Sequence, residues 1–257
     1  MTSCLLYQDL SQHYDLMCRD INYREQCEFS HRALQLFAPQ LFPQTMPRSL
    51  DLGCGTGPHI VHLIQQGYQA TGLDINAPML EQAQNRCPSA LFSLQDMSCF
   101  QFEQRFDLIT CFLYSIHYNF PLERFSETLQ CAYNALEPGG IFIFDLVGRR
   151  YIANDSGHSH SLTLDEGAFT FQSRWYDTHI DDRLDLFITI KKDDAGLQKI
   201  WQDRHTMLAI EIEHVHDALT AIGFEVSIFD RDFGRFIEWQ GKIGNVIFIA
   251  QKTLPQT

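Results

Sequence analysis

The sequence lacks the segments that carry a chain into or across a membrane. No apolar run approaches the roughly 20 residues that span a bilayer. The N-terminal stretch MTSCLLYQDLSQHYDL has no cationic segment followed by an apolar one, as a secretory signal would require. The eight cysteines form no C-x-x-C pair, and none follows Cys131. This spacing favours reduced thiols over a disulfide framework, so we expect a cytoplasmic protein with no membrane partner.

Positive charge is also scarce. The 257 residues include 19 Lys and Arg against 32 Asp and Glu, which gives a formal net charge of −13. The sequence contains no cluster of basic residues that would offset this charge on one face. Because an acidic surface repels phosphate backbones, we expect no nucleic-acid partner.

Patterns typical of metal sites are missing as well. Histidines occur in three close pairs, but neither carboxylates nor cysteines join them at ligand spacing. The pairs are His59 with His62, His158 with His160, and His214 with His216. We therefore predict no metal. Apolar residues, in contrast, are plentiful at 45% of the chain, enough for one large core.

Residues 48–147 alternate short apolar runs with amphipathic stretches. This alternation is typical of βαβ units and predicts an α/β fold with a parallel sheet and helices on both faces. The predicted strands are 49–52, 69–73, 90–94, 106–112 and 141–146, and the predicted helices are 58–66, 78–87 and 121–136.

The flanking segments differ in pattern. Residues 1–47 predict an N-terminal helical cap, which ends in a proline-rich stretch. Residues 148–210 show period-two alternation between turn signals and predict an antiparallel β insertion, with strands at 169–176, 184–191 and 200–208. Residues 211–257 return to helix and strand, with a helix at 213–222 and strands at 224–229 and 245–251. We expect the insertion to line a substrate pocket or to form a homodimer contact.

The run Asp51-Leu52-Gly53-Cys54-Gly55-Thr56-Gly57 lies between a predicted strand and a predicted helix. Glycines at such a turn let the main chain approach a ligand closely. A dinucleotide site requires G-x-G-x-x-G, and Pro58 occupies the position of its third glycine. The G-x-G-x-G pattern therefore favours an amino acid joined to a nucleoside over a pyrophosphate.

Carboxylates follow the next two predicted strands. Asp74 ends the second strand, where it can accept hydrogen bonds from both hydroxyls of a ribose or, alternatively, cap the following helix. After the third strand, Asp96 offers a carboxylate for an exocyclic amine and Met97 an apolar side chain for an adenine face. A simple loop turn explains Asp96 and Met97 equally well.

These residues together resemble the class I S-adenosylmethionine-dependent methyltransferases, whose first motif E/D-x-G-x-G-x-G is matched by Asp51, Gly53, Gly55 and Gly57. The resemblance covers residues 48–147 and 213–251. It implies a Rossmann-like seven-stranded, mostly parallel sheet with an antiparallel last strand, and S-adenosylmethionine as cofactor. It also places Asp74 at the ribose, Asp96 and Met97 at the adenine, and Phe112 and Leu113 near the methionine moiety. Cys54, Ile75 and Met79 complete the predicted cofactor-binding set.

A narrower resemblance connects four short runs of residues. Tyr14-Asp15, the Gly55-Thr56-Gly57-x-His59 run, Ser115 to Tyr118, and Asp203-Arg204-His205 look like the amino-sugar N,N-dimethyltransferases. Glycine N-methyltransferase-like enzymes share parts of this layout. The likeness implies N-methylation of a small-molecule acceptor by direct in-line displacement. The alternatives are a tRNA-nucleoside methyltransferase of the same fold and a regulatory protein that binds the cofactor without turnover.

Four side chains are the candidates for the acceptor side of the site. Tyr14 is predicted to close over the cofactor, where its ring face attracts the sulfonium, although packing against the sheet explains it equally well. His117 and Tyr118 follow the fourth strand at the edge where open α/β sheets bind ligands, and either can relay a proton. His205 lies on a strand leading back to the core, where a structural role is the alternative.

Overall fold

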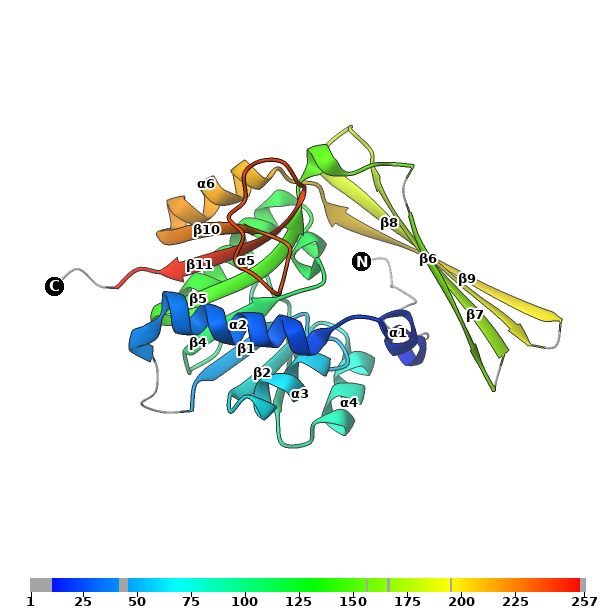
Figure 1. Ribbon diagram of the computed structural model, residues 1–257, viewed down its shortest axis with the longest axis horizontal. Helices are drawn as coiled ribbons and strands as arrows, with labels where there is room; N and C mark the ends of the chain where they lie inside the picture. Colours follow the sequence, from blue (N-terminus) through cyan, green and yellow to red (C-terminus); the bar gives the residue numbers. More distant parts are fainter. Residues whose placement is uncertain (1–10, 42–45, 156, 166, 195, 255–257) are drawn as a thin grey trace.

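The computed structural model describes residues 11–41, 46–155, 157–165, 167–194 and 196–254. They form two sheets, which lie side by side in Figure 1 with a short helix between them. The larger sheet has seven strands in the order β10-β11-β5-β4-β1-β2-β3, and the smaller has four in the order β6-β7-β8-β9. None of the helices in the described part of the chain has the length and apolar character that a membrane crossing needs.

The central sheet is parallel except for its last strand. The pairs β1 with β2, β1 with β4, β2 with β3 and β4 with β5 are parallel, whereas β11 runs antiparallel to both β5 and β10. Its strands are β1 (Arg48–Leu52), β2 (Gln69–Asp74), β3 (Leu91–Leu94), β4 (Phe106–Cys111), β5 (Leu136–Val147), β10 (Phe224–Asp230) and β11 (Asn245–Lys252). This topology confirms the predicted fold class.

Helices cover both faces of this sheet because successive residues of its buried strands point to opposite sides. On β5, Phe142 and Phe144 pack with α5 (Leu122–Ala135) and α6 (Ile212–Ile222). Ile141 and Ile143 pack on the other face with α2 (Tyr23–Phe37), α3 (Pro58–Gln65) and α4 (Ala77–Arg86). The remaining short helices are α1 (Ser11–Met17), η2 (Pro39–Leu41), η3 (Ser115–Tyr118) and η4 (Arg149–Tyr151).

The second sheet is an antiparallel meander of β6 (Gly157–Leu164), β7 (Gly167–Asp177), β8 (Arg183–Asp194) and β9 (Leu197–Leu208). One face is apolar, with Phe169, Phe171 and Ile188 buried. Tyr14, Leu16 and Met17 of α1 pack against this apolar cluster. Helix α1 therefore joins the insertion to the cofactor side of the central sheet (Figure 1). The homodimer through this sheet stays a prediction.

The start of β5 and the presence of β6 differ from the sequence-based expectations. Strand β5 begins at Leu136 and not at residue 141, because the Pro138-Gly139-Gly140 segment continues the strand with a register shift against β4. Strand β6 is not among the predicted strands, since its first three residues are exposed and only its second half alternates, with Leu162 buried between the exposed Ser161 and Thr163. The N-terminal cap contains α1 and α2, while residues 1–10 and 42–45 of it lie outside the described residues.

Candidate active site

The turn that follows β1 is built from glycines in the left-handed region. Gly53, Gly55 and Gly57 have φ angles of 67°, 55° and 79°, which other residues rarely adopt. At Gly57 an added Cβ would lie 3.1 Å from the Cβ of Ala83, so the turn also packs closely on α4. Helix α3 begins directly after it, with Pro58 in its first turn. The sequence therefore places exposed main chain at the carboxyl edge of the sheet.

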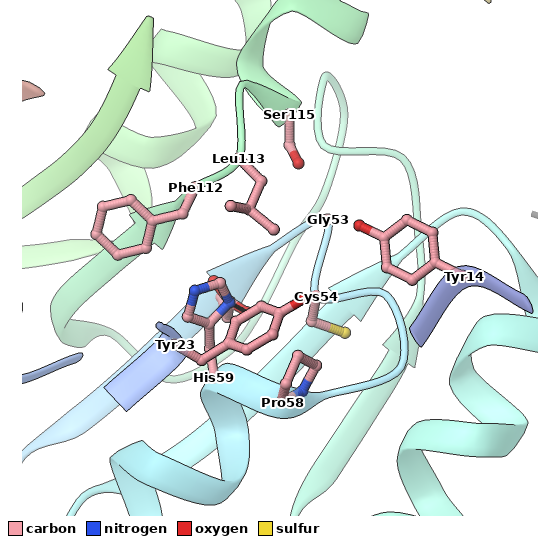
Figure 2. Close-up of a pocket in the computed structure, with 10 residues that line it drawn as sticks. Tyr14, Tyr23, Gly53, Cys54, Pro58, His59, Phe112, Leu113 and Ser115 are labelled. Atoms are coloured by element: carbon pink, nitrogen blue, oxygen red, sulfur yellow. Dashed lines mark ion pairs between the residues drawn. The ribbon is translucent and has the colours of Figure 1, made fainter. Parts of the chain in front are cut away.

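A pocket opens beside this turn (Figure 2). Tyr14 approaches from α1, and Phe112 and Leu113 come from the loop after β4. The lining combines the predicted Tyr14, Asp51, Gly53, Cys54, Phe112 and Leu113 with Tyr23, Pro58, His59 and Ser115. Sequence reasoning did not assign Tyr23 to the site, because a tyrosine at a helix start carries no motif. Burial raises the pKa of the Cys54 thiol well above its usual value, so Cys54 serves as a neutral part of the wall.

Asp51 presents a carboxylate oxygen to this pocket. The residue is 1% exposed, and its Oδ1 accepts a hydrogen bond from Thr110 Oγ1 at 2.7 Å. Its Oδ2 is buried without a hydrogen bond from the described residues and lies 3.5 Å from His59 Nδ1. His59 Nε2 lies 2.6 Å from Gln26 Oε1, which can only accept, so Nε2 carries a proton toward Gln26. A buried carboxylate oxygen of this kind fits the ammonium group of an amino-acid ligand.

Asp74 fixes the glycine turn to the end of β2. Its Oδ2 accepts from Gly55 N at 2.9 Å, and its Oδ1 accepts from Asn76 N at 2.8 Å and Asn76 Nδ2 at 3.0 Å. Burial raises the pKa of the Asp74 carboxyl above its usual value, although the hydrogen bonds from Asn76 and Gly55 act in the opposite direction. These bonds cap the start of α4, as in the helix-cap alternative, and contact of Asp74 with a ribose stays a prediction.

The two residues predicted for the adenine side, Asp96 and Met97, make different contacts. Asp96 accepts from Ser98 N at 2.9 Å and pairs with Arg124, as in the loop-turn alternative. Burial raises the pKa of Asp96, but the hydrogen bonds from Ser98 and Arg124 outweigh it and hold that pKa below its usual value. Met97 reaches the glycine turn, where its Cε lies 3.4 Å from the position of a Cβ on Gly53. Ile75 is 50% exposed and Met79 is 1% exposed on α4, and contact of either residue with the cofactor stays a prediction.

The loop after β4 has an unusual backbone. Leu113 and Tyr114 are consecutive non-glycine residues with φ angles of 58° and 61°. Asp145, which is fully buried, accepts from Tyr114 N at 2.7 Å and from Arg231 Nε at 2.7 Å. The Arg231 guanidinium also lies 4.8 Å from the centre of the Tyr114 ring. The ion pair of Asp145 with Arg231 holds the strained loop that carries Leu113 and Ser115 into the pocket.

His117 takes a different place from the one predicted. The ring is 1% exposed, its Nδ1 lies 2.7 Å from Leu208 O, and its Nε2 accepts from Val147 N at 3.2 Å. Burial lowers the pKa of His117 to about 4 against the opposing effects of Leu208 and Asp145. Because main-chain groups occupy both ring nitrogens, neither is available to a substrate. We therefore reassign His117 from catalysis to a structural link between η3, β5 and β9.

Tyr118 and His205 are brought together although 87 residues separate them. The Tyr118 hydroxyl lies 2.6 Å from His205 Nδ1, and His205 Nε2 lies 3.0 Å from Asp203 Oδ2. Burial lowers the pKa of His205, while the hydrogen bond and charge of Asp203 act in the opposite direction. Sequence reasoning proposed the tyrosine and the histidine separately and did not foresee their contact.

Helix α1 is held over the glycine turn by polar contacts. Thr56 Oγ1 donates to Asp15 Oδ1 at 2.6 Å, and Arg86 pairs with the same carboxylate. Arg86 Nη1 also donates to Thr56 O at 2.9 Å. These contacts place the Tyr14 ring 3.8 Å from the position of a Cβ on Gly55. In the described part of the chain, no group of three or more His, Cys, Asp or Glu side chains is arranged to hold a metal ion.

Comparison with known proteins agrees with this site. Residues 50–140 match the methyltransferase domain family. YqeM of Bacillus subtilis is 25% identical over 254 residues, covering 97% of this chain and 98% of that protein. It is named as a methyltransferase, and the name states no acceptor. A tRNA (guanine-N(7)-)-methyltransferase of Rubrobacter xylanophilus is 30% identical over 186 residues, covering 66% of this chain and 77% of that protein.

Proteins that act on amino sugars also match. A dTDP-3-amino-3,4,6-trideoxy-alpha-D-glucopyranose N,N-dimethyltransferase of Streptomyces venezuelae is 29% identical over 96 residues, 37% of this chain and 40% of that protein. The structure of SAM-bound CalS10, an amino pentose methyltransferase of Micromonospora echinaspora, superposes with a TM-score of 0.79 at 18% identity, covering 94% and 96% of the two chains. This likeness in fold extends over nearly the whole of both chains.

Proposed function

The chain belongs to the class I S-adenosylmethionine-dependent methyltransferases, and we propose that it transfers the methyl group to a nitrogen of a small-molecule acceptor. The observation that carries this proposal is the position of Tyr14. Its side chain lines the pocket at the glycine turn and also belongs to the cluster on the insertion that contains Tyr118, Trp175 and Trp201. Through Tyr14, the pocket at the glycine turn thus adjoins the apolar cluster between α1 and the second sheet, which supports a compact acceptor.

The residues of the pocket fit the cofactor by their chemistry. Asp51 offers a buried acceptor oxygen for the methionine ammonium, and Phe112 and Leu113 supply apolar surface. S-Adenosylmethionine, when bound, supplies a methyl carbon that an acceptor lone pair attacks opposite the sulfur. The main task of the chain is therefore to position the acceptor and exclude water, and positioning can contribute about 7–11 kcal/mol.

Two observations support a small amine acceptor over RNA. One relative is named as an N,N-dimethyltransferase of a dTDP-amino sugar. A structural neighbour is named as an amino pentose methyltransferase. The net charge of −13 disfavours the phosphate contacts that RNA binding requires. Because one relative is named as a tRNA (guanine-N(7)-)-methyltransferase, RNA is the second candidate acceptor. The test below includes tRNA for this reason.

Matched acceptors test this proposal. Amino sugars, each paired with the sugar that carries a hydroxyl in place of the amine, are incubated with the protein and methyl-labelled cofactor, and tRNA is included as a third substrate. We expect labelled product from amines and none from their hydroxyl partners or from tRNA. Transfer to the hydroxyl partners or to tRNA alone would contradict the proposal. Cofactor binding with no transfer to any of the three would favour the regulatory alternative.

A further inference from the structure

We infer that Trp175 of the insertion is a positioning residue for the cofactor, and that it acts through Tyr114 on the loop that lines the cofactor pocket. The indole ring of Trp175 meets the ring of Tyr114 edge to face, with 5.2 Å between the ring centres and 82° between the ring planes. The inference concerns the cofactor side of the site, so it holds whatever group accepts the methyl.

The backbone at Tyr114 requires support from its surroundings. The φ angles of Leu113 and Tyr114 are 58° and 61°, and residues with side chains keep such a conformation only where neighbouring contacts fix it. The central sheet supplies part of this support. The Tyr114 hydroxyl donates to Asn245 Oδ1 on β11 at 2.8 Å, and Tyr114 N donates to Asp145 Oδ1 on β5 at 2.7 Å. The Arg231 guanidinium, directly after β10, lies 4.8 Å from the centre of the tyrosine ring.

The insertion supports the same residue through Trp175. This side chain lies on the face of β7 that also carries the buried Phe169 and Phe171, because residues an even number apart on a strand share a face. Its ring also meets that of His117, with 5.3 Å between centres and 74° between planes. Contacts of this geometry are favourable for aromatic rings. One indole therefore contacts residues on both sides of Ser115 and spans the start of η3.

Leu113 and Ser115 connect this contact to the pocket. They flank Tyr114 in the chain, and both line the pocket beside the glycine turn, as Figure 2 shows. Ser115 packs closely on that turn, since an added Cβ on Gly53 would lie 3.3 Å from Ser115 Cβ. A shift of Tyr114 therefore moves both of its neighbours relative to the turn. The insertion thus contributes to cofactor binding, although Trp175 is not among the residues that line this pocket.

The residues around Trp175 are themselves fixed in position. Its strand pairs with β8, where Leu186 lies opposite it. The His117 ring that it contacts is held through both nitrogens by main-chain groups of β9 and β5. Removal of the indole therefore leaves a space beside Tyr114, because neither neighbour is free to move into it. The strained turn at Leu113 and Tyr114 then loses the support that comes from the insertion.

Calorimetric titration with S-adenosylhomocysteine, the demethylated cofactor, tests the inference without any acceptor. We expect Trp175→Leu to weaken binding by about 2–12-fold, the scale of one edge-to-face aromatic pair. Trp175→Phe keeps a ring at this position and should restore most of the affinity. Because Trp175 acts through Tyr114, the double variant with Tyr114→Leu should bind no more weakly than Tyr114→Leu alone. Wild-type affinity in Trp175→Leu, or losses that add in the double variant, would overturn the inference.

The matched control is Phe187→Leu, which also removes an aromatic ring from the insertion. Phe187 lies on β8 opposite Arg174, and so on the other face of the second sheet from Trp175. Its ring contacts the guanidinium groups of Arg174 and Arg204, at 5.6 and 5.7 Å from the ring centre. We expect Phe187→Leu to bind the cofactor product with wild-type affinity. A weakening equal to that in Trp175→Leu would show only a general loosening of the insertion and would refute the role of Trp175.

A measurement on the wild-type chain does not depend on the folding of any variant. The chain has three tryptophans, whose indole N–H signals are assigned in a ¹H–¹⁵N spectrum and followed during titration with S-adenosylhomocysteine. We expect the Trp175 signal to shift on saturation, because Tyr114 connects its ring to two residues of the pocket. The signal of Trp239, whose indole donates to Ile243 O at 2.8 Å, should stay in place. An unshifted Trp175 signal, or an equal shift of Trp239, would overturn the inference. Neither experiment involves methyl transfer, so failure of the proposed acceptor class leaves both results unaffected.

Discussion

Replacement of Arg231 by methionine tests how the strained loop of the site is held. Arg231 Nε donates to Asp145 Oδ2 at 2.7 Å, and the Asp145 side chain has 0% exposure against 22% for Arg231. Methionine keeps much of the apolar stem but leaves the carboxylate buried without its cation. Removal of one partner of a buried pair costs about 3–5 kcal/mol. We expect Arg231→Met to lower the free energy of unfolding by that amount.

Urea denaturation monitored by tryptophan fluorescence measures this loss. The control is Arg24→Met, which removes an exposed i,i+4 pair with Glu28 whose side chains are 75% and 44% exposed. Such a pair contributes about 0.3–0.5 kcal/mol. The double variant Arg231→Met with Asp145→Asn should recover stability relative to Arg231→Met, because no buried charge remains and Tyr114 N keeps an acceptor. A loss in Arg231→Met no larger than in Arg24→Met would refute this explanation of the loop.

Three further predictions concern the turn, the pocket and pH. Gly57→Ala should weaken cofactor binding measured by calorimetry, since its φ of 79° and the Ala83 Cβ at 3.1 Å both oppose a side chain; unchanged affinity would remove the turn from the site. Asp51→Asn should weaken cofactor binding by about 10–100-fold, the equivalent of a hydrogen bond to a charged group, and an equal affinity would show that Asp51 does not meet the ammonium. Because the pKa of His117 is lowered to about 4 in the folded chain from a usual 6.5, the unfolded chain binds more protons between these values. Denaturation should therefore show stability falling by about 3 kcal/mol as the pH drops from 7 to 4, and His117→Asn should reduce this slope; a wild-type slope in that variant would contradict the prediction.

The sequence was sufficient for the features that depend on local pattern. The alternation of the first strand and the three glycines that follow it predict β1 and its turn without distant information. The other features depend on contacts between remote residues. His117 is fixed by Leu208, which is 91 residues away, and Asp145 meets Arg231 86 residues later. No periodicity encodes such pairs, so their roles appear only when the chain is folded.

Local patterns also account for the assignments that failed. His117 follows the fourth strand at the edge where ligands bind, yet main-chain groups of β5 and β9 occupy both of its ring nitrogens. Strand β6 alternates only in its second half, around the buried Leu162, so little of its length indicates a strand. Tyr118 and His205 were each recognisable as candidates by position, but only the packing of β9 against η3 joins them.

The most direct measurement of the central claim is the destination of the methyl label. The purified protein is incubated with methyl-labelled S-adenosylmethionine and a cell extract, the extract is separated into small molecules, protein and RNA, and the labelled product is identified by mass spectrometry. We predict label in the small-molecule fraction, on an amine that has become one methylene heavier. Label confined to RNA or protein, or label on oxygen, would contradict the account.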